Sequence, residues 1–292
     1  MDTLIRLARK LPSSWLLRAT QLRFRYPRIE PLLEWCLERT LRNRNMVILR
    51  GAGRGLRFNC GHGPISFVFG THELGMQRAF ELLAGTGMTF YDVGANVGFY
   101  CVIVGRLVGP TGRVIAFEPL PDNATSIEHN ARLNGFANVE ARQEALGDDD
   151  GEARFLISAS SGWGKLESAG APPARMAGEV AVRLRRLDSL LKEGAIPPPN
   201  LMKIDIEGGE VGFLRGASET LRRCRPILAV DLHGTNAPVA ALLDELGYSS
   251  IVLGSQKSIV ESPWDACVIA RPTERDELAS ALQELRTVST AS

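Results

Sequence analysis

The segment between Met88 and Glu118 constrains the fold of this chain more than any other. It begins with an apolar run, Met88–Val93, that is long enough for a buried strand, and then enters a tight turn rich in glycine. A helical segment, Val97–Val108, follows, and a break with glycine and proline separates it from a second apolar run, Arg113–Phe117. This order of strand, turn, helix and strand predicts an open parallel sheet, and such sheets bind nucleotides at the carboxyl ends of their strands.

The turn in this segment, DVGANVG from Asp92 to Gly98, indicates the kind of ligand. It lacks the G-x-G-x-x-G that places a pyrophosphate at a helix N-terminus. Asp92 would repel a pyrophosphate and suits a ligand with a cationic amino group, such as S-adenosylmethionine. Gly94 and Gly98 have no Cβ atom, so the backbone can approach a ligand closely there. Glu118 lies 20 residues past Gly98, where such folds place an acid on the ribose hydroxyls. Taken alone, the turn also fits a glycine-rich connection that binds nothing.

Charge is distributed unevenly along the 292 residues, although the net charge is only +1. Residues 1–57 hold 13 Lys/Arg and 4 Asp/Glu, a net of +9, so the remainder carries −8. The total indicates no polyanionic partner such as nucleic acid. The first 45 residues read as helices that interleave leucine and tryptophan with arginine. They are interpreted either as a helical cap on the domain or as an arm that contacts an anionic membrane surface or an acidic acceptor.

Length and pattern predict three parts. We expect a basic extension of helices and short strands over residues 1–72, an α/β domain over 73–273 and a helical tail on the surface over 274–292. Within the extension, residues 46–70 alternate like short strands or a hairpin, with Gly51–Gly55 as the hairpin turn. Five scattered cysteines without a C-x-x-C indicate a reducing compartment and no zinc site. The pattern shows no signal peptide and no membrane span, so we expect a cytoplasmic protein, peripheral to a membrane if the basic arm docks there.

Downstream of Glu118 and Pro119, a helix is expected to run from Asp122, as N-cap, to about residue 134. A third strand is predicted over 139–146, and in doubly wound sheets a nucleotide base lies beside the end of this strand. Glu144 would accept from an adenine amine, and the backbone at Ala145 would meet the ring edge. The acids at 149 and 150 are interpreted as a solvated turn. Strands over 152–157 and 180–184 are expected to pair around a long loop that is either a lid or a disordered insertion.

Two later strands, LMKIDI (201–206) and ILAVDL (227–232), end in polar residues. Two acids and a lysine at a strand end are costly to bury without partners, which makes Asp205 and Glu207 candidate site residues. Glu210 is interpreted as a cap of the next helix. His233 follows the later strand and is expected at the same sheet edge as Asp92, Glu118 and Asp205.

These segments together resemble the FkbM family of S-adenosylmethionine-dependent methyltransferases. The resemblance covers roughly residues 73–247, and it rests on YDVGANVG (91–98), FEP (117–119), Leu187–Asp188, KIDIEGGE (203–210) and the DLH strand end (231–233). It implies a Rossmann-like seven-stranded, mostly parallel sheet with a last antiparallel hairpin, and O-methylation of a hydroxyl on a sugar or natural product. Asp231 and Gly209 depart from residues common in the family. An NAD-dependent oxidoreductase and a non-catalytic interaction protein on the same scaffold are the alternatives.

The resulting hypothesis assigns roles along one sheet edge. The amino-acid end of S-adenosylmethionine would lie against Asp92 and the turn at Gly94, Asn96 and Gly98. The ribose would lie against Glu118–Pro119, and the adenine between Glu144 and Ala145. Asp205, on the methyl side, and His233 are the candidate bases, and histidine is the more economical one near neutral pH. Asp205, Glu207, Asp231 and His233 could instead hold a divalent metal, but the sequence shows no tight ligand spacing and does not favour one.

Overall fold

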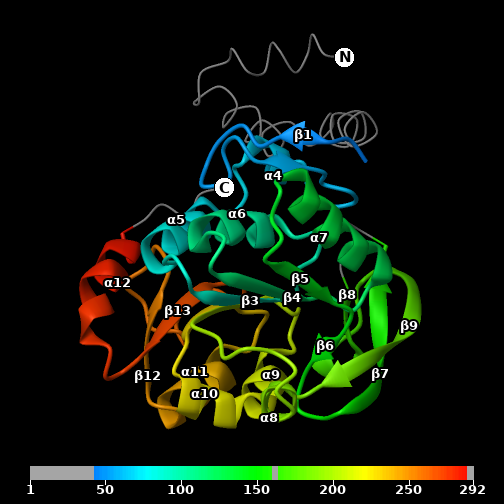
Figure 1. Cartoon of the computed structure of the whole chain (residues 1–292). Coiled ribbons are helices and arrows are strands. Elements are labelled where there is room, and N and C mark those ends of the chain that lie inside the picture. The colour runs from blue at the N-terminus through cyan, green and yellow to red at the C-terminus, as the bar shows by residue number, and fades with distance from the viewer. Residues whose placement is uncertain (1–42, 160–163, 288–292) are drawn as a thin grey trace, which may run out of the picture.

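A seven-stranded sheet forms the centre of the molecule (Figure 1). In the computed structural model, which describes residues 43–159 and 164–287, the strand order is β12-β13-β11-β10-β3-β4-β5. Only β13 runs antiparallel to its neighbours within this sheet. The predicted Rossmann-like sheet with a last antiparallel hairpin is therefore confirmed. Its strands are β3 (Thr89–Val93), β4 (Arg113–Phe117), β5 (Val139–Arg142), β10 (Leu201–Ile204), β11 (Ile227–Asp231), β12 (Tyr248–Val252) and β13 (Cys267–Pro272).

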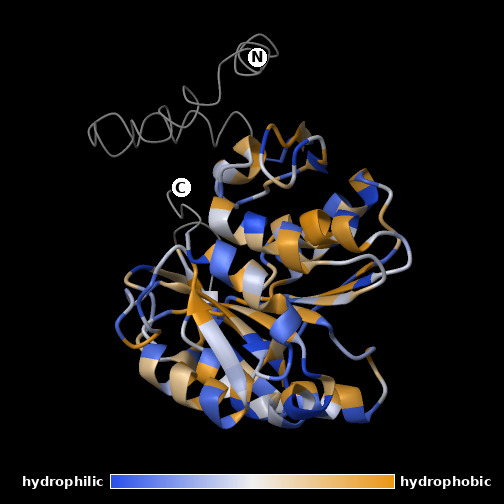
Figure 2. Cartoon of the chain, turned by 90° about the vertical axis from the view of Figure 1, so that its left-hand side faces the viewer, coloured by the Kyte–Doolittle hydropathy of each residue, from blue (hydrophilic) through white to orange (hydrophobic). Residues whose placement is uncertain are grey.

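Helices cover both faces of this sheet (Figure 1). Successive side chains of a strand point to opposite faces, so the fully buried β3 contributes Phe90 to one hydrophobic cluster and Tyr91 to the other. Figure 2 shows apolar residues concentrated in the sheet and on the helix faces that meet it. One layer contains α5 (Leu74–Leu83), α6 (Phe99–Val108) and α7 (Pro121–Leu133). The other contains α8 (Leu187–Lys192), α9 (Glu210–Gly216), α10 (Ser218–Cys224) and α11 (Asn236–Glu245).

A second, four-stranded sheet lies at one end of the molecule, in the order β6-β9-β7-β8. Its strands are β6 (Ala145–Leu146), β7 (Gly151–Ser158), β8 (Gly164–Leu166) and β9 (Met176–Arg185), with the short helix η1 (Glu167–Ala169) after β8. The predicted antiparallel pair is β7 and β9. The single third strand over 139–146 is wrong, because the chain turns after Arg142 and Ala145–Leu146 pairs with β9 instead. The predicted long loop is also wrong in part, because β8, η1 and the start of β9 lie within it.

The described part of the N-terminal extension begins with a short hairpin. Strands β1 (Met46–Val47) and β2 (Arg57–Phe58) pair antiparallel around the predicted glycine-rich turn. The alternation at Ile65–Phe69 is not a strand, however, but one helical turn, α4 (Ser66–Phe69). Phe67 and Val68 are buried there, and Gly70 ends the turn in the left-handed conformation. The helices expected over residues 1–42 lie outside the described residues.

Three other helix predictions need correction. Asp122 is not the N-cap of α7, because Pro121 is the first helical residue and Asp122 lies in the first turn. The helix expected after Glu210 is two helices, α9 and α10, separated at Ala217. The C-terminal tail is helical, with η2 (Asp276–Leu278) and α12 (Ala279–Leu285), but it is not simply on the surface, since Leu282 and Leu285 join the core. Among the described residues, no helix is both long and apolar enough to cross a bilayer.

Candidate active site

The glycine turn after β3 brings two strand ends together. Gly94 has φ +83°, and a Cβ atom there would lie 1.9 Å from the carbonyl oxygen of Asp205, so only glycine allows this approach of the turn to the end of β10. Gly98, with φ +83°, begins α6 against Ile127 of α7. The two glycines therefore allow close packing within the chain. Gly94 also lines a pocket at the strand ends.

A pocket opens at the carboxyl ends of β3, β4 and β10, beneath the second sheet. Its walls are largely apolar, and carboxylate and amide groups lie between them, which suits a flat heterocycle with polar edges. Of the predicted cofactor residues, Gly94, Asn96, Glu118, Pro119, Glu144, Ala145 and Asp205 line it, whereas Asp92 and Gly98 do not. The second sheet contributes Leu146, Phe155, Gly164 and Leu166, and Val93, Phe117, Asn123, Ile206, Glu207 and Gly209 complete the lining.

Glu118 holds the backbone on both sides of this pocket. Its Oε2 accepts from the backbone N–H of Asn96 at 2.9 Å, and its Oε1 accepts from that of Leu120 at 3.0 Å. Burial raises the pKa of Glu118 to about 7, against hydrogen bonds from Leu120, Asn123 and Asn96 that lower it. The carboxylate thus fixes the glycine turn and the entry to α7 in addition to facing the pocket.

Asp92 and Glu144 lie in different surroundings. Asp92 is buried and does not line the pocket, and its Oδ2 accepts from the thiol of Cys101 at 3.1 Å. Burial raises the pKa of Asp92 to about 6, although Lys203 acts in the opposite direction. Glu144 forms ion pairs with Arg142 at 2.9 Å and Arg183 at 3.3 Å, so the chain already satisfies much of its charge.

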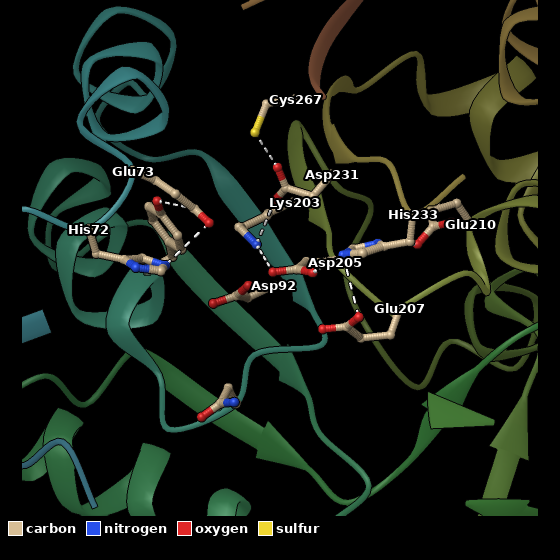
Figure 3. Close-up of polar contacts among 12 residues, drawn as sticks. His72, Glu73, Asp92, Lys203, Asp205, Glu207, Glu210, Asp231, His233 and Cys267 are labelled. Carbon is tan, nitrogen blue, oxygen red and sulfur yellow. Dashed lines mark hydrogen bonds and ion pairs between the residues drawn. The ribbon is translucent and has the colours of Figure 1, made fainter. Parts of the chain in front are cut away.

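The ammonium of Lys203 is buried among carboxylates (Figure 3). The Nζ of Lys203 is 2.7 Å from Oδ2 of Asp205 and 3.0 Å from Oδ2 of Asp231, and it lies 5.1 Å from the centre of the Tyr100 ring. Burial acts to lower the pKa of Lys203, but the attraction of these two carboxylates, with Glu73 and Asp92 farther away, outweighs it and raises the pKa well above its usual value.

Glu73 approaches the same region from the start of α5. It adopts a left-handed conformation, φ 43°, that costs energy for a non-glycine residue. Its carboxylate accepts from the hydroxyl of Tyr100 at 2.7 Å and pairs with His72 at 3.2 Å. Burial acts to raise the pKa of Glu73, but His72, Lys203 and Tyr100 outweigh it and the pKa is lowered. A residue from outside the glycine-turn unit therefore helps to balance the charge behind the pocket.

Asp205, Glu207 and His233 form a cluster at the pocket end of β10 and β11 (Figure 3). The Nε2 atom of His233 is 3.7 Å from Oδ1 of Asp205 and 3.6 Å from Oε2 of Glu207. These three ligand-type atoms lie within 4.8 Å of one another. The predicted neighbourhood of Asp205 and His233 thus exists, while Asp231 faces Lys203 and the thiol of Cys267 instead.

The other nitrogen of His233 is held by Glu210. Oε1 of Glu210 lies 3.0 Å from Nδ1 of His233 and accepts from the N–H of Gly208 at 2.9 Å, while Oε2 accepts from the hydroxyl of Thr235 at 2.8 Å. Glu210 is fully buried, so the interpretation as a simple helix cap is wrong. Burial lowers the pKa of His233, but Glu210, Asp205 and Glu207 outweigh it and raise the pKa to about 9. At neutral pH the ring in this cluster is therefore protonated.

Sequence reasoning assigned no role to Lys203 or Glu73 and undervalued Glu210. The signal for Lys203 was present, because a lysine inside an otherwise apolar strand must find carboxylates if the strand is buried. Asp150 is exposed, as expected of a solvated turn, but its carboxylate also accepts from Arg185 at 2.8 Å, from the N–H of Arg186 at 3.0 Å and from Ser189 at 2.5 Å. Asp149 remains exposed.

Fold and site together define a Rossmann-like α/β protein with a nucleotide-type pocket at its strand ends and an acid–histidine cluster beside it. The chain belongs to the methyltransferase FkbM domain family, which it matches over residues 92–250. This match covers the glycine turn, the pocket carboxylates and the cluster, and it confirms the resemblance inferred from the motifs. The protein is a methyltransferase.

The chain is also similar to named methyltransferases. The chain is 26% identical over 231 residues to the hexuronic acid methyltransferase AglP of Haloferax volcanii, covering 76% of this chain and 90% of that protein. It is 26% identical over 186 residues to the 2-O-methyltransferase NoeI of Sinorhizobium fredii, covering 58% and 75%. The crystal structure of methyltransferase FkbM from Methylobacillus flagellatus is 17% identical, with a TM-score of 0.45 over 63% of this chain and 43% of that one.

Proposed function

We propose that this protein transfers the methyl group of S-adenosylmethionine to a hydroxyl of a sugar, a glycan or a related natural product. The observation that carries the proposal is the continuity of the pocket: it runs from Glu118 at the end of β4 to Asp205 and Glu207 after β10, where the cluster with His233 begins. A cofactor bound in this pocket would therefore lie beside the cluster that contains the proposed base. The relatives named for hexuronic acid and for 2-O-methylation support a sugar hydroxyl as acceptor.

In this proposal, polar groups of the pocket orient the ribose, the adenine and the amino-acid end of the cofactor. Glu118 and the N–H groups of the turn would take the ribose, and Glu144 with the backbone of Ala145 would meet the adenine edge between the apolar walls. Asp92 would act on the amino-acid end from below, as a buried charge rather than through direct contact, because it does not line the pocket. The backbone of Gly94 and Asn96 would supply the direct contacts at this end, and Gly98 would hold the turn against α7.

The sulfonium of the bound cofactor supplies an activated methyl group. The chain must align the acceptor oxygen with it and accept the hydroxyl proton; alignment alone contributes ~7–11 kcal/mol in well-oriented systems. Asp205 and His233 are the proposed bases. With its pKa raised to about 9, His233 would already carry a proton at neutral pH, so we propose Asp205 as the first proton acceptor. The protonated ring would then stabilise the charge that develops.

Radiolabelled methyl transfer tests this proposal. The enzyme would be incubated with S-adenosylmethionine labelled in its methyl group and with separate panels of neutral glycosides, hexuronic acid glycosides and hydroxylated natural products. We expect label in a sugar panel, in a linkage that survives mild alkali as an ether does and a methyl ester does not. Label in the natural-product panel alone would reject the sugar class, and alkali-labile label would reject O-methylation of a hydroxyl.

A further inference from the structure

The cluster after β10 and β11 has the chemistry of a cation site. Asp205 and Glu207 offer carboxylate oxygens, and His233 offers its Nε2 once a cation displaces the proton from that nitrogen. The three residues follow two adjacent parallel strands whose ends are fixed by the sheet. Oxygen ligands suit Mg²⁺ and Mn²⁺, and imidazole extends the range to other divalent transition metals. These side chains are partly accessible, with 30%, 31% and 17% of their surfaces exposed, and the two acids line the pocket.

The distances fit an ion with little rearrangement. Ligand atoms ~2.1 Å from a metal lie ~3.0 Å apart when adjacent in an octahedron and ~4.2 Å apart when opposite. Here Nε2 of His233 is 3.7 Å and 3.6 Å from the two carboxylate oxygens, and all three atoms lie within 4.8 Å. Shifts of a few tenths of an ångström would therefore bring the three into coordination.

A separate observation concerns the support of these groups. Metal-binding histidines usually donate their second ring nitrogen to a carboxylate, which fixes the ring and the tautomer. Glu210 does this for His233 at 3.0 Å, is fully buried, and is itself held by Gly208 and Thr235. Glu207, with φ 55°, has a left-handed backbone conformation. Glu210 thus holds the ring with Nε2 of His233 toward Asp205 and Glu207.

We infer that Asp205, Glu207 and His233 bind one divalent cation at the pocket end of β10 and β11. Glu210 acts as a positioning residue through the His233 ring. Resting on the proposed function, the inference extends to the acceptor: Asp205 and Glu207 line the pocket, so oxygens of a sugar diol bound there would complete the shell. A cation there would lower the pKa of a bound hydroxyl; Asp205 and His233 would then act as ligands, and the hydroxyl proton would pass to solvent water.

Manganese binding to the protein without cofactor or acceptor tests this directly. Mn²⁺ would be titrated into the full chain and followed by electron paramagnetic resonance, with echo modulation to detect a nitrogen ligand. We expect one site with a nitrogen coupling, at least tenfold weaker binding in Glu207→Gln, loss of the coupling in His233→Ala, and a ~10–100-fold loss in Glu210→Gln. The exposed Asp149→Asn variant is the matched control and should bind as the parent does.

Two further results keep the outcomes separate. Each variant would first be checked for binding of S-adenosylhomocysteine, which reports an intact fold and pocket. Parent protein that binds Mn²⁺ no better than Glu207→Gln, or with no nitrogen coupling, overturns the cation site and leaves the methyltransferase proposal standing. Failure of S-adenosylhomocysteine to bind, with the Mn²⁺ site present, would instead reject the proposed cofactor.

Discussion

Replacing Lys203 by methionine tests the charge balance on which the site depends. The ammonium lies 2.7 Å and 3.0 Å from the carboxylates of Asp205 and Asp231, and Glu73 and Asp92 act on it from farther away. Methionine fills much of the same volume but leaves these carboxylates without their cation. Breaking a buried ion pair by removing one partner costs ~3–5 kcal/mol, because the remaining charge is uncompensated. At roughly 2 °C per kcal/mol for a chain of this size, the melting temperature should fall by about 6–10 °C.

The assay is urea unfolding followed by circular dichroism and by tryptophan fluorescence, with thermal unfolding as a second measure. Lys257→Met, at an exposed position, is the matched control and should change the free energy of unfolding by less than ~0.5 kcal/mol. Adding Asp231→Asn to Lys203→Met should recover part of the loss, since one unpaired charge is removed. A Lys203→Met variant that loses less than about 1 kcal/mol, or a double variant less stable than either single one, would refute the reasoning.

The remaining predictions concern activity, pH and the basic arm. His233→Ala should reduce turnover at least tenfold and change S-adenosylhomocysteine affinity less than about twofold, because the ring lies beside Asp205 and Glu207 and does not line the cofactor pocket; turnover that survives in His233→Ala while Asp205→Asn abolishes it would remove His233 from the proposed catalytic pair. Glu118, with its pKa raised to about 7, favours its protonated form in the empty pocket, so the stability that it contributes is present below its unfolded pKa and is lost as pH rises through about 7. A ribose bound by the carboxylate reverses this preference, so cofactor affinity should rise by up to about tenfold per pH unit between pH 5 and 7, and calorimetry on Glu118→Gln should show a shallower slope. Because residues 1–57 carry a net charge of +9, the protein should sediment with anionic liposomes and be released in high salt. Each cation near the surface contributes about 1 kcal/mol to such binding. Binding that is absent, or indifferent to lipid charge, would leave the arm a structural cap.

The fold could be predicted where local pattern and topology agree. The strand, turn and helix around Asp92–Gly98 predict a parallel sheet. The acids that follow the later apolar strands could be predicted to lie at the same edge, because parallel strands end at one edge of the sheet. The prediction failed where a short segment leaves one sheet and pairs with a strand of the other. The run 139–146 reads as one strand, but a turn after Arg142 transfers Ala145 to the second sheet, and only pairing with β9 reveals it.

The site residues likewise fall into those that the sequence could predict and those that it could not. Glu118, Asp205 and His233 could be predicted to lie at one sheet edge, because each follows the end of a parallel strand. Glu73 could not be placed, since its approach depends on a left-handed residue before α5 and on tertiary packing against Tyr100. The role of Glu210 could not be predicted, because an acid at the start of a helix is usually a helix cap. Only its complete burial beside His233 distinguishes a residue that holds the histidine ring from a simple cap.

Calorimetric titration with S-adenosylhomocysteine and, separately, with NAD tests the central claim most directly. The account predicts one site for S-adenosylhomocysteine and no measurable heat with NAD. It also predicts weaker binding in Glu118→Ala, by ~1.5–3 kcal/mol for each lost charge-assisted hydrogen bond, and unchanged binding in Glu128→Ala, an exposed acid on α7. Because Glu118 also holds the turn at Asn96 and the entry to α7, its variant must first be shown to be folded. Binding of NAD in place of S-adenosylhomocysteine, or full affinity in a folded Glu118→Ala variant, would contradict the account.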